Sequence, residues 1–212
     1  MNSTLQYMAT MVRCAVMSET NHLLEKWNGR HADQTHQPKA AEVLEQNLHL
    51  LPTQGRALDL ACGLGGNALL LAEAGLKVTA WDLSNVAIRR LQELADARNL
   101  ANLKPEVRDL SLHPLPANTF DVIVVSYFLE RSLIPSMIEA LTPGGLIYYQ
   151  TFTRAAATEN GPSNPSYRLG DNELLSLFGI LNIRVYREEN LLGDISHGLR
   201  NIAMLIAEKH SD

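Results

Sequence analysis

Short apolar runs alternate with runs of helical spacing along most of the chain. The runs of strand length lie at residues 56–62, 77–82, 104–109, 121–128 and 145–152. Each run is short and several contain β-branched residues, as expected of strands buried on both faces. The alternation therefore predicts βαβ units on a mostly parallel sheet, with helices on both faces.

The segments between these runs have the start and stop signals of helices. "NALLLAEAG" is closed by Gly75, and "SNVAIRRLQELADARN" opens on Ser84, a favourable N-cap. A helix around 132–141 should end before Pro143. Upstream, "PKAAEVLEQNLHLL" is amphipathic and starts on a proline. "DNELLSLFG" predicts a short helix capped by Asp171.

After the fifth run the pattern changes. "TRAAATENGPSNPSYRLG" is rich in Gly, Pro, Asn and Ser, and residues 153–169 are expected to form a lid or binding loop. "NIRVYREEN" and "RNIAMLIAEK" follow each other without room for a crossover helix, so they predict an antiparallel hairpin. The predicted fold class is α/β, a Rossmann-like seven-stranded, mostly parallel sheet with an antiparallel C-terminal hairpin.

Length and composition limit the number of domains. A chain of 212 residues fits one α/β domain, so we expect an N-terminal extension at 1–24 and a single domain at 25–212. The start of the chain lacks the pattern of a signal peptide, and we expect residues 1–16 to be dispensable for activity. The longest apolar run is far shorter than the ~20 residues that span a bilayer.

Charge and the pattern of cysteines and histidines limit the classes of ligand and partner and the expected cellular location. The formal net charge is -5 and no Lys/Arg cluster appears, which argues against nucleic acid and leaves a small-molecule substrate. Cys14 and Cys62 form no disulfide framework, so a cytoplasmic location is expected. The histidines show no ligand spacing, and no metal site is predicted. The oligomeric state stays open between monomer and homodimer.

A glycine-rich turn follows the first strand in "DLACGLGG". Glycine permits a positive φ and a close approach of backbone to a ligand, and the helix that follows favours an anionic group at its N-terminus. A tight strand-to-helix connection would give the same pattern. Asp82, however, ends the second strand 19 residues after Gly63, where a carboxylate accepts ribose hydroxyls.

Two cofactor classes fit this turn. The dinucleotide fingerprint Gly-x-Gly-x-x-Gly, counted from Gly63, reaches Ala68 at its last position, which is an allowed variant. Asp59 lies inside the first strand, where it would face a pyrophosphate badly and a methionine ammonium well. Asp59 and the terminal hairpin favour S-adenosylmethionine. A nicotinamide-dependent oxidoreductase and a cofactor-binding interaction protein without turnover remain as alternatives.

The sequence resembles class I S-adenosylmethionine-dependent methyltransferases, and within them the small bacterial enzymes related to tellurite-resistance and thiopurine methyltransferases. The resemblance covers about residues 25–209 and rests on "KWNGRH", "ALDLACGLGGNALLLAEAGLKVTAWDLS", "VRDL", "FDVIVVSYFLER", "LTPGGLIYYQTF" and the closing hairpin. It implies S-adenosyl-L-methionine as the cofactor and methyl transfer as the reaction.

The resemblance also implies roles for residues at matching positions. Asp59 supports the methionine end, Asp82 holds the ribose, and Ser126 lies near the sulfonium. The "KWNGRH" segment resembles a motif that closes over the cofactor, with one side chain that stacks and an arginine that pairs with the cofactor carboxylate. The implied cofactor-binding set is Trp27, Arg30, Asp59, Ala61, Gly63, Gly65, Asp82, Leu83, Asp109, Leu110 and Ser126.

The residues that would choose the acceptor depart from the family pattern. The candidate pocket is Tyr127, Arg131, Arg154 and Tyr167. "NPSY" resembles a motif of amino-group methyltransferases, but it follows the fifth strand rather than the fourth, so we interpret it as a turn that shapes the pocket. Arginines near the strand ends should give the site an anion-receptive mouth; they are Arg131, Arg154, Arg168 and Arg200.

Methyl transfer is an in-line displacement at an activated carbon, so the protein mainly aligns the nucleophile and excludes water. A soft nucleophile such as a thiolate, selenide or telluride needs no general base, and the expected acceptor is a thiol, a chalcogen oxyanion or a similar small molecule. No catalytic residue is therefore assigned from the sequence.

Overall fold

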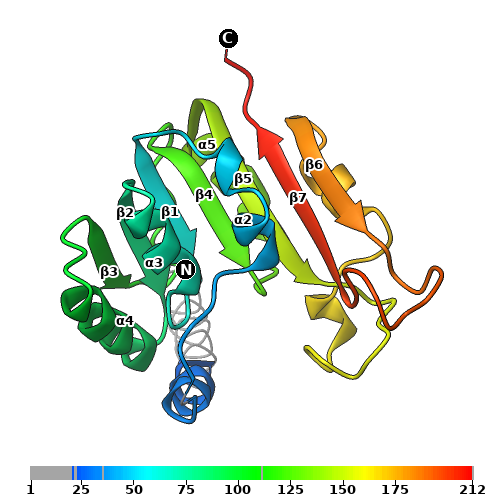
Figure 1. Ribbon diagram of the computed structural model, residues 1–212, viewed down its shortest axis with the longest axis horizontal. Helices are drawn as coiled ribbons and strands as arrows, with labels where there is room; N and C mark the ends of the chain where they lie inside the picture. The colour runs from blue at the N-terminus through cyan, green and yellow to red at the C-terminus, as the bar shows by residue number, and fades with distance from the viewer. Residues whose placement is uncertain (1–20, 22, 35, 111, 212) are drawn as a thin grey trace, which may run out of the picture.

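The computed structural model describes residues 21, 23–34, 36–110 and 112–211. Its centre is a seven-stranded sheet of order β3-β2-β1-β4-β5-β7-β6, shown in Figure 1. Neighbours among β1 to β5 pair in parallel, whereas β7 is antiparallel to both β5 and β6. The predicted fold class is thus confirmed. The strands are β1 Arg56–Leu60, β2 Lys77–Asp82, β3 Leu103–Val107, β4 Phe120–Ser126, β5 Leu141–Phe152, β6 Asn182–Glu188 and β7 Ile202–Glu208.

Both faces of the central strands are buried, as predicted, whereas the edge strand β3 is partly exposed. In β4, Val122 and Val124 belong to one core cluster and Ile123 and Val125 to the other, and all four are fully buried. Helices α3 (Gly66–Glu73) and α4 (Asn85–Ala97) pack into the first cluster, while α5 (Ile134–Ala140) and α6 (Glu173–Leu177) pack into the second. No helix of the described residues is long and apolar enough to cross a membrane.

The helix boundaries follow the local signals in most places. Ser84 caps α4, because its Oγ accepts a hydrogen bond from the Ala87 N–H at 3.1 Å. Gly75 lies just after α3 with φ +94°, the left-handed conformation that glycine adopts freely. Helix α5 ends at Ala140, before Pro143, as predicted.

The predicted helix over 38–51 is wrong in extent. The structure has only a four-residue helix, α2 (Glu42–Glu45), and a 3-10 helix at Leu48–Leu50. The segment before α2 is held by the glycine turn: the Ala41 N–H donates to Asn67 Oδ1 at 2.8 Å, and Lys39 lies against Gly66. These tertiary contacts override the local amphipathic pattern.

The predicted cap of α6 is also wrong. Asn172, in the left-handed conformation with φ +57°, is the N-cap and makes no side-chain cap bond. The Asp171 carboxylate instead accepts from Asn190 Nδ2 at 3.2 Å. A contact between distant loops thus replaces the local cap that the sequence suggested.

Three strands end earlier than predicted, at the edge where the site lies. β1 ends at Leu60 rather than at Cys62. β4 ends at Ser126 because Tyr127 has φ +57°. β3 ends at Val107, so Asp109 lies in the following loop rather than at the strand's last position.

A helix over residues 23–32 lies at the carboxyl ends of β1 and β4, the lower edge of the sheet in Figure 1. The expected boundary at residue 25 stays a prediction. The proposed dispensable segment, residues 1–16, lies outside the described residues.

Candidate functional site

The glycine turn joins β1 to α3 at the carboxyl edge of the sheet. Ala61, Gly63 and Gly65 have φ values of +55°, +52° and +80°, so the chain turns sharply through left-handed conformations. The turn is closed by the Gly65 N–H, which donates to the Cys62 carbonyl at 2.8 Å. At positions 63 and 65, glycine gives the backbone a conformation that other residues rarely adopt. A Cβ at Gly65 would lie 2.3 Å from the Leu91 side chain, so glycine there also lets α4 pack against the turn.

Gly66 is a requirement that the sequence analysis missed. A Cβ at this position would lie 2.0 Å from the Lys39 carbonyl oxygen, which is backbone and has little freedom to move. Glycine at position 66 therefore leaves room for the backbone of the segment that leads into α2. The double glycine in the sequence was the only available signal.

Asp59 is completely buried in β1 beneath the turn. Its carboxylate accepts from the Ala68 N–H at 2.9 Å and from Asn67 Nδ2 at 3.4 Å, both at the start of α3. Burial raises the pKa of Asp59 to about 7, although these two hydrogen bonds act in the opposite direction. The site thus holds a carboxyl group that is poised to titrate near neutral pH.

Asp82 ends β2 beside the turn, as the spacing predicted. One carboxylate oxygen accepts from the Gly63 N–H at 2.8 Å and the other from the Ser84 N–H at 2.8 Å. A carboxylate oxygen can accept two hydrogen bonds, so each Asp82 oxygen retains acceptor capacity for a ligand hydroxyl.

Asn67 connects the two sides of the site, a role that the sequence analysis missed. Its Nδ2 donates to Ser126 Oγ at 2.9 Å and also reaches Asp59. Its Oδ1 accepts from the Ala41 N–H. The side chain therefore fixes the end of β4 and the approach to α2 relative to β1.

The segment "KWNGRH" lies over the glycine turn. Ser84 Oγ donates to Asn28 Oδ1 at 2.7 Å, and Arg90 donates to the His31 carbonyl at 2.5 Å. His31 is buried, and a Cβ at Gly63 would lie 3.3 Å from its Cε1. Burial lowers the pKa of His31. The N-terminal helix is thereby held across the turn.

The two candidates on this helix lie close together. The Trp27 ring stacks on the His31 ring with centroids 5.8 Å apart. Arg30 is exposed and its guanidinium lies 5.4 Å from the centroid of the Trp27 ring. Their roles toward a cofactor stay predictions.

The candidates for the adenine side follow the ends of β2 and β3. Leu83 is half-buried between Asp82 and Ser84. Leu110 packs against the second core cluster, and the Asp109 carbonyl accepts from the His113 N–H at 3.1 Å. The structure thus brings these residues to the same edge of the sheet as the glycine turn.

The arginines expected at the mouth mainly hold the loops together. Arg131 pairs with Glu173, with 2.5 Å between Nε and Oε1, and also donates to the Ser166 and Arg168 carbonyls. Arg168 donates to the carbonyls of residues 153, 160 and 162. Arg154 makes one long bond to the Pro165 carbonyl, at 3.4 Å.

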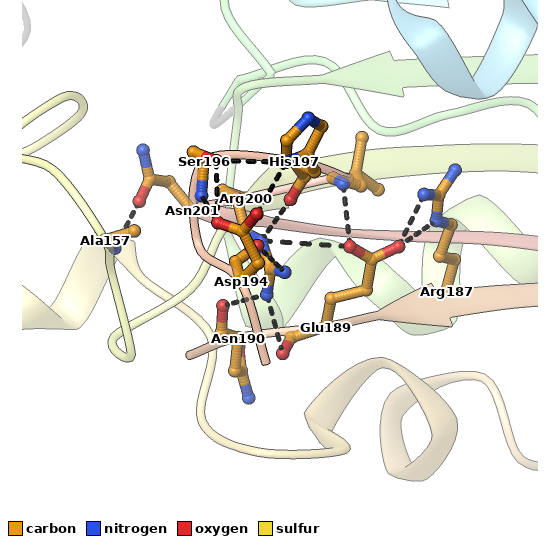
Figure 2. Close-up of polar contacts among 10 residues, drawn as sticks. Ala157, Arg187, Glu189, Asn190, Asp194, Ser196, His197, Arg200 and Asn201 are labelled. Carbon is orange, nitrogen blue, oxygen red and sulfur yellow. Dashed lines mark hydrogen bonds and ion pairs between the residues drawn. The ribbon is translucent and has the colours of Figure 1, made fainter. Parts of the chain in front are cut away.

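In the β6–β7 connection, too, an arginine holds loop segments together by donating to backbone carbonyls (Figure 2). Arg200 donates to the His197, Asn190 and Asp194 carbonyls at 2.6, 2.9 and 2.8 Å. Asn201 Oδ1 accepts from the Ala157 N–H at 2.5 Å and so joins this connection to the 153–170 loop.

The "NPSY" segment is a turn, as interpreted. Asn164 Oδ1 accepts from the Ser166 N–H at 2.9 Å, and a 3-10 helix follows at Pro165–Tyr167. The Tyr167 side chain is 49% exposed. Acceptor roles for Arg131, Arg154 and Tyr167 stay predictions.

A family model described as tellurite resistance protein TehB matches residues 24–197. The probable S-adenosyl-L-methionine-dependent methyltransferase TehB of Haemophilus influenzae is 32% identical over 142 residues, 63% of this chain and 48% of the relative. The cypemycin N-terminal methyltransferase of a Streptomyces species is 30% identical over 138 residues, 59% of this chain and 55% of the relative. The chain thus spans about half the length of these curated relatives.

The fold comparison agrees. The crystal structure of TehB from Haemophilus influenzae superimposes with a TM-score of 0.64 at 26% identity, covering 79% of this chain and 61% of that one. A methyltransferase from Methanosarcina mazei gives a TM-score of 0.63 at 19% identity, covering 82% of this chain and all of that one, and shows the fold alone. The resemblance found in the sequence is confirmed: the chain belongs to the TehB family of class I methyltransferases, whose cofactor is S-adenosyl-L-methionine.

Proposed function

We propose that this chain transfers a methyl group from S-adenosyl-L-methionine, held at the glycine turn, to a small-molecule acceptor by in-line displacement. One observation carries the proposal. Asp59 is buried under the turn and Asp82 lies beside it, and each is fixed by hydrogen bonds to the turn or to the start of α3. This is the pair of carboxylates that a methionine ammonium and a ribose require.

The residues around the turn fit such a cofactor. Gly63 and Gly65 give the turn its left-handed backbone, and Asp82 retains acceptor capacity for the ribose hydroxyls. Trp27 and Arg30 lie on the helix that is held across the turn, and their side chains supply an aromatic ring and a guanidinium. The proposed cofactor-binding set is the full set given by the sequence, with Asn67 added as the residue that positions Asp59 and Ser126.

Bound at this site, S-adenosyl-L-methionine supplies a methyl carbon activated by a positively charged sulfur. The protein has to align a nucleophile with that carbon and exclude water. The helix over 23–32 covers the turn, and Asn67 fixes the end of β4. No proton transfer by a side chain is needed for a soft nucleophile.

The acceptor class is a finer proposal. The sequence favoured a thiol or a chalcogen oxyanion, and the tellurite-resistance description of the matching family model is consistent with the latter. Other relatives are named for N-terminal methylation and for O-methylation in ubiquinone biosynthesis. We also propose a small molecule rather than nucleic acid as the partner, because the chain is acidic and has no Lys/Arg cluster. The proposed assembly is a monomer or homodimer, and the proposed location, from the cysteine usage, is the cytoplasm.

Methyl transfer from isotopically labelled S-adenosyl-L-methionine to a panel of thiols, chalcogen oxyanions, hydroxyls and amines tests the proposal. We expect labelled product with at least one class and equimolar S-adenosylhomocysteine. The Asp82→Ala variant should lose turnover because its cofactor affinity falls. Binding of S-adenosylhomocysteine without transfer to any acceptor would instead support a methyltransferase fold that only binds its cofactor.

A further inference from the structure

A carboxylate from the N-terminal part of the chain reaches the ends of β4 and β5. Glu42, half-buried in α2, accepts from Gln150 Nε2 at 2.5 Å and from the Tyr127 hydroxyl at 3.1 Å. Gln150 is fully buried, and its Oε1 accepts from the Val43 N–H at 2.8 Å. Gln150 Nε2 also donates to the Tyr127 hydroxyl at 2.9 Å, so both amide hydrogens are used and the side chain fixes the position of Glu42.

This cluster adjoins the residue expected beside the cofactor sulfonium. Ser126, the last residue of β4, pairs with Gln150 in the sheet register. Tyr127 follows directly in the left-handed conformation, with φ +57°, and its N–H donates to the Gln150 carbonyl at 2.8 Å. This conformation is strained for a bulky residue and persists only where its surroundings impose it, which is frequent at ligand sites.

The cluster is negatively charged. Among the described residues, Glu42 has no ion pair and its second carboxylate oxygen, Oε1, accepts no hydrogen bond. Its partners are a neutral amide and a phenol. Burial, with the charges of Glu42 and Glu45 adding to it, raises the pKa of Tyr127, which keeps the phenol neutral. The field at this position therefore repels anions and attracts cations.

An aromatic wall borders the carboxylate. The Tyr127 and Phe152 rings lie with centroids 5.1 Å apart at an interplanar angle of 39°. Tyr127 is 45% exposed, so its side of the wall is accessible, whereas Phe152 is half-buried with Gly161 against its ring. The nearby cation, Arg168, lies 5.7 Å from the Phe152 centroid and donates to three loop carbonyls. A carboxylate next to aromatic faces is a suitable site for an ammonium group on an apolar body.

We propose that Glu42, Tyr127 and Phe152 form the acceptor subsite and that the acceptor is a small molecule carrying an amine. This inference rests on the proposed methyltransferase function and differs from the thiol or oxyanion expected from the sequence. The acceptor ammonium gives a proton to Glu42. The nitrogen lone pair then forms the bond to the methyl carbon, and the electron pair of the broken carbon–sulfur bond stays on sulfur. The products are a methylated ammonium and a neutral thioether.

Binding to the protein saturated with S-adenosylhomocysteine tests this subsite separately from turnover. The probes are benzylammonium, benzoate and tellurite, titrated by calorimetry into the wild-type protein and the Glu42→Gln and Glu45→Gln variants. Both substitutions remove one charge from the same helix, but Glu45 is exposed. We expect benzylammonium to bind the wild type, with a loss of about 10- to 100-fold in Glu42→Gln and little change in Glu45→Gln, because a hydrogen bond to a charged group is lost.

Several results would contradict the proposal that Glu42, Tyr127 and Phe152 bind an amine acceptor. They are tighter binding of benzoate or tellurite than of benzylammonium, no binding of any probe at millimolar concentration, and equal losses in the two variants. Loss of S-adenosylhomocysteine binding in Glu42→Gln, with binding of 5′-methylthioadenosine retained, would assign Glu42 to the cofactor ammonium instead. Failure of the wild type to bind S-adenosylhomocysteine at all would refute the proposed function itself. Unfolding temperatures of both variants show whether the fold is intact.

Discussion

Burial of Asp59 predicts that cofactor binding near neutral pH releases a proton. The side chain is completely buried and its pKa is raised to about 7, mainly by desolvation. A methionine ammonium placed next to this carboxylate favours the ionised form and lowers the pKa again. The ligand therefore drives off the proton that the ligand-free protein holds.

The size of the Asp59 pKa shift also determines how strongly the stability of the ligand-free protein depends on pH. Between an unfolded pKa near 3.8 and a folded pKa of about 7, the folded protein binds more protons than the unfolded chain. The free energy of unfolding therefore falls as the pH rises through this window. Three units at about 1.4 kcal/mol each give a loss of about 4 kcal/mol from this group, complete above the folded pKa.

At pH 7 the carboxyl is about half protonated, so binding should release about half a proton per site. The number should approach one near pH 6 and zero near pH 8.5. Calorimetric titration with S-adenosylhomocysteine in two buffers of different ionisation enthalpy measures this number directly, since the released proton is taken up by the buffer.

Two variants identify the group responsible. Asp59→Asn should abolish the proton release at pH 7. His31→Gln should retain it, because burial lowers the pKa of His31 and leaves that ring neutral at pH 7. Proton uptake by the wild type, or an unchanged release in Asp59→Asn, would refute the reasoning.

The remaining predictions concern the turn and the loops. Gly66→Ala should destabilise the protein by about 1–3 kcal/mol in urea unfolding, because the new Cβ would lie 2.0 Å from the Lys39 carbonyl oxygen. Gly29→Ala is the control, since a Cβ there would meet nothing within 4 Å. Equal destabilisation by the two substitutions would contradict this prediction. Asp82→Ala should weaken S-adenosylhomocysteine binding by about 2–3 kcal/mol, and unchanged affinity would remove Asp82 from the site. Asn201→Ala should lower the free energy of unfolding by about 1–3 kcal/mol and speed proteolysis of the 153–170 loop, because three hydrogen bonds to residues 157 and 158 are lost. An unchanged cleavage rate would show that Asn201 does not hold this loop.

The sequence predicted the parts of the structure that depend on local patterns. Strand periods, the Ser84 cap and the glycine turn act within a few residues, so the sheet and most helices followed from them. Asp59 and Asp82 were placed correctly because parallel strands bring their carboxyl ends to one edge.

The parts that were missed depend on contacts between distant residues. Glu42 and Gln150 are 108 positions apart, and nothing near Glu42 in the sequence indicates that it meets β5. Arg131 appeared available for an anion, but Glu173, which is 42 positions away, pairs with it. Likewise Asp171 resembled a helix cap and instead binds Asn190. Local patterns contain no information about such partners.

Calorimetry with S-adenosylhomocysteine and NADH tests the central claim most directly. The wild-type protein should bind one S-adenosylhomocysteine per chain, the Asp82→Ala variant should bind it more weakly, and NADH should not bind. Binding of NADH without binding of S-adenosylhomocysteine would contradict the account.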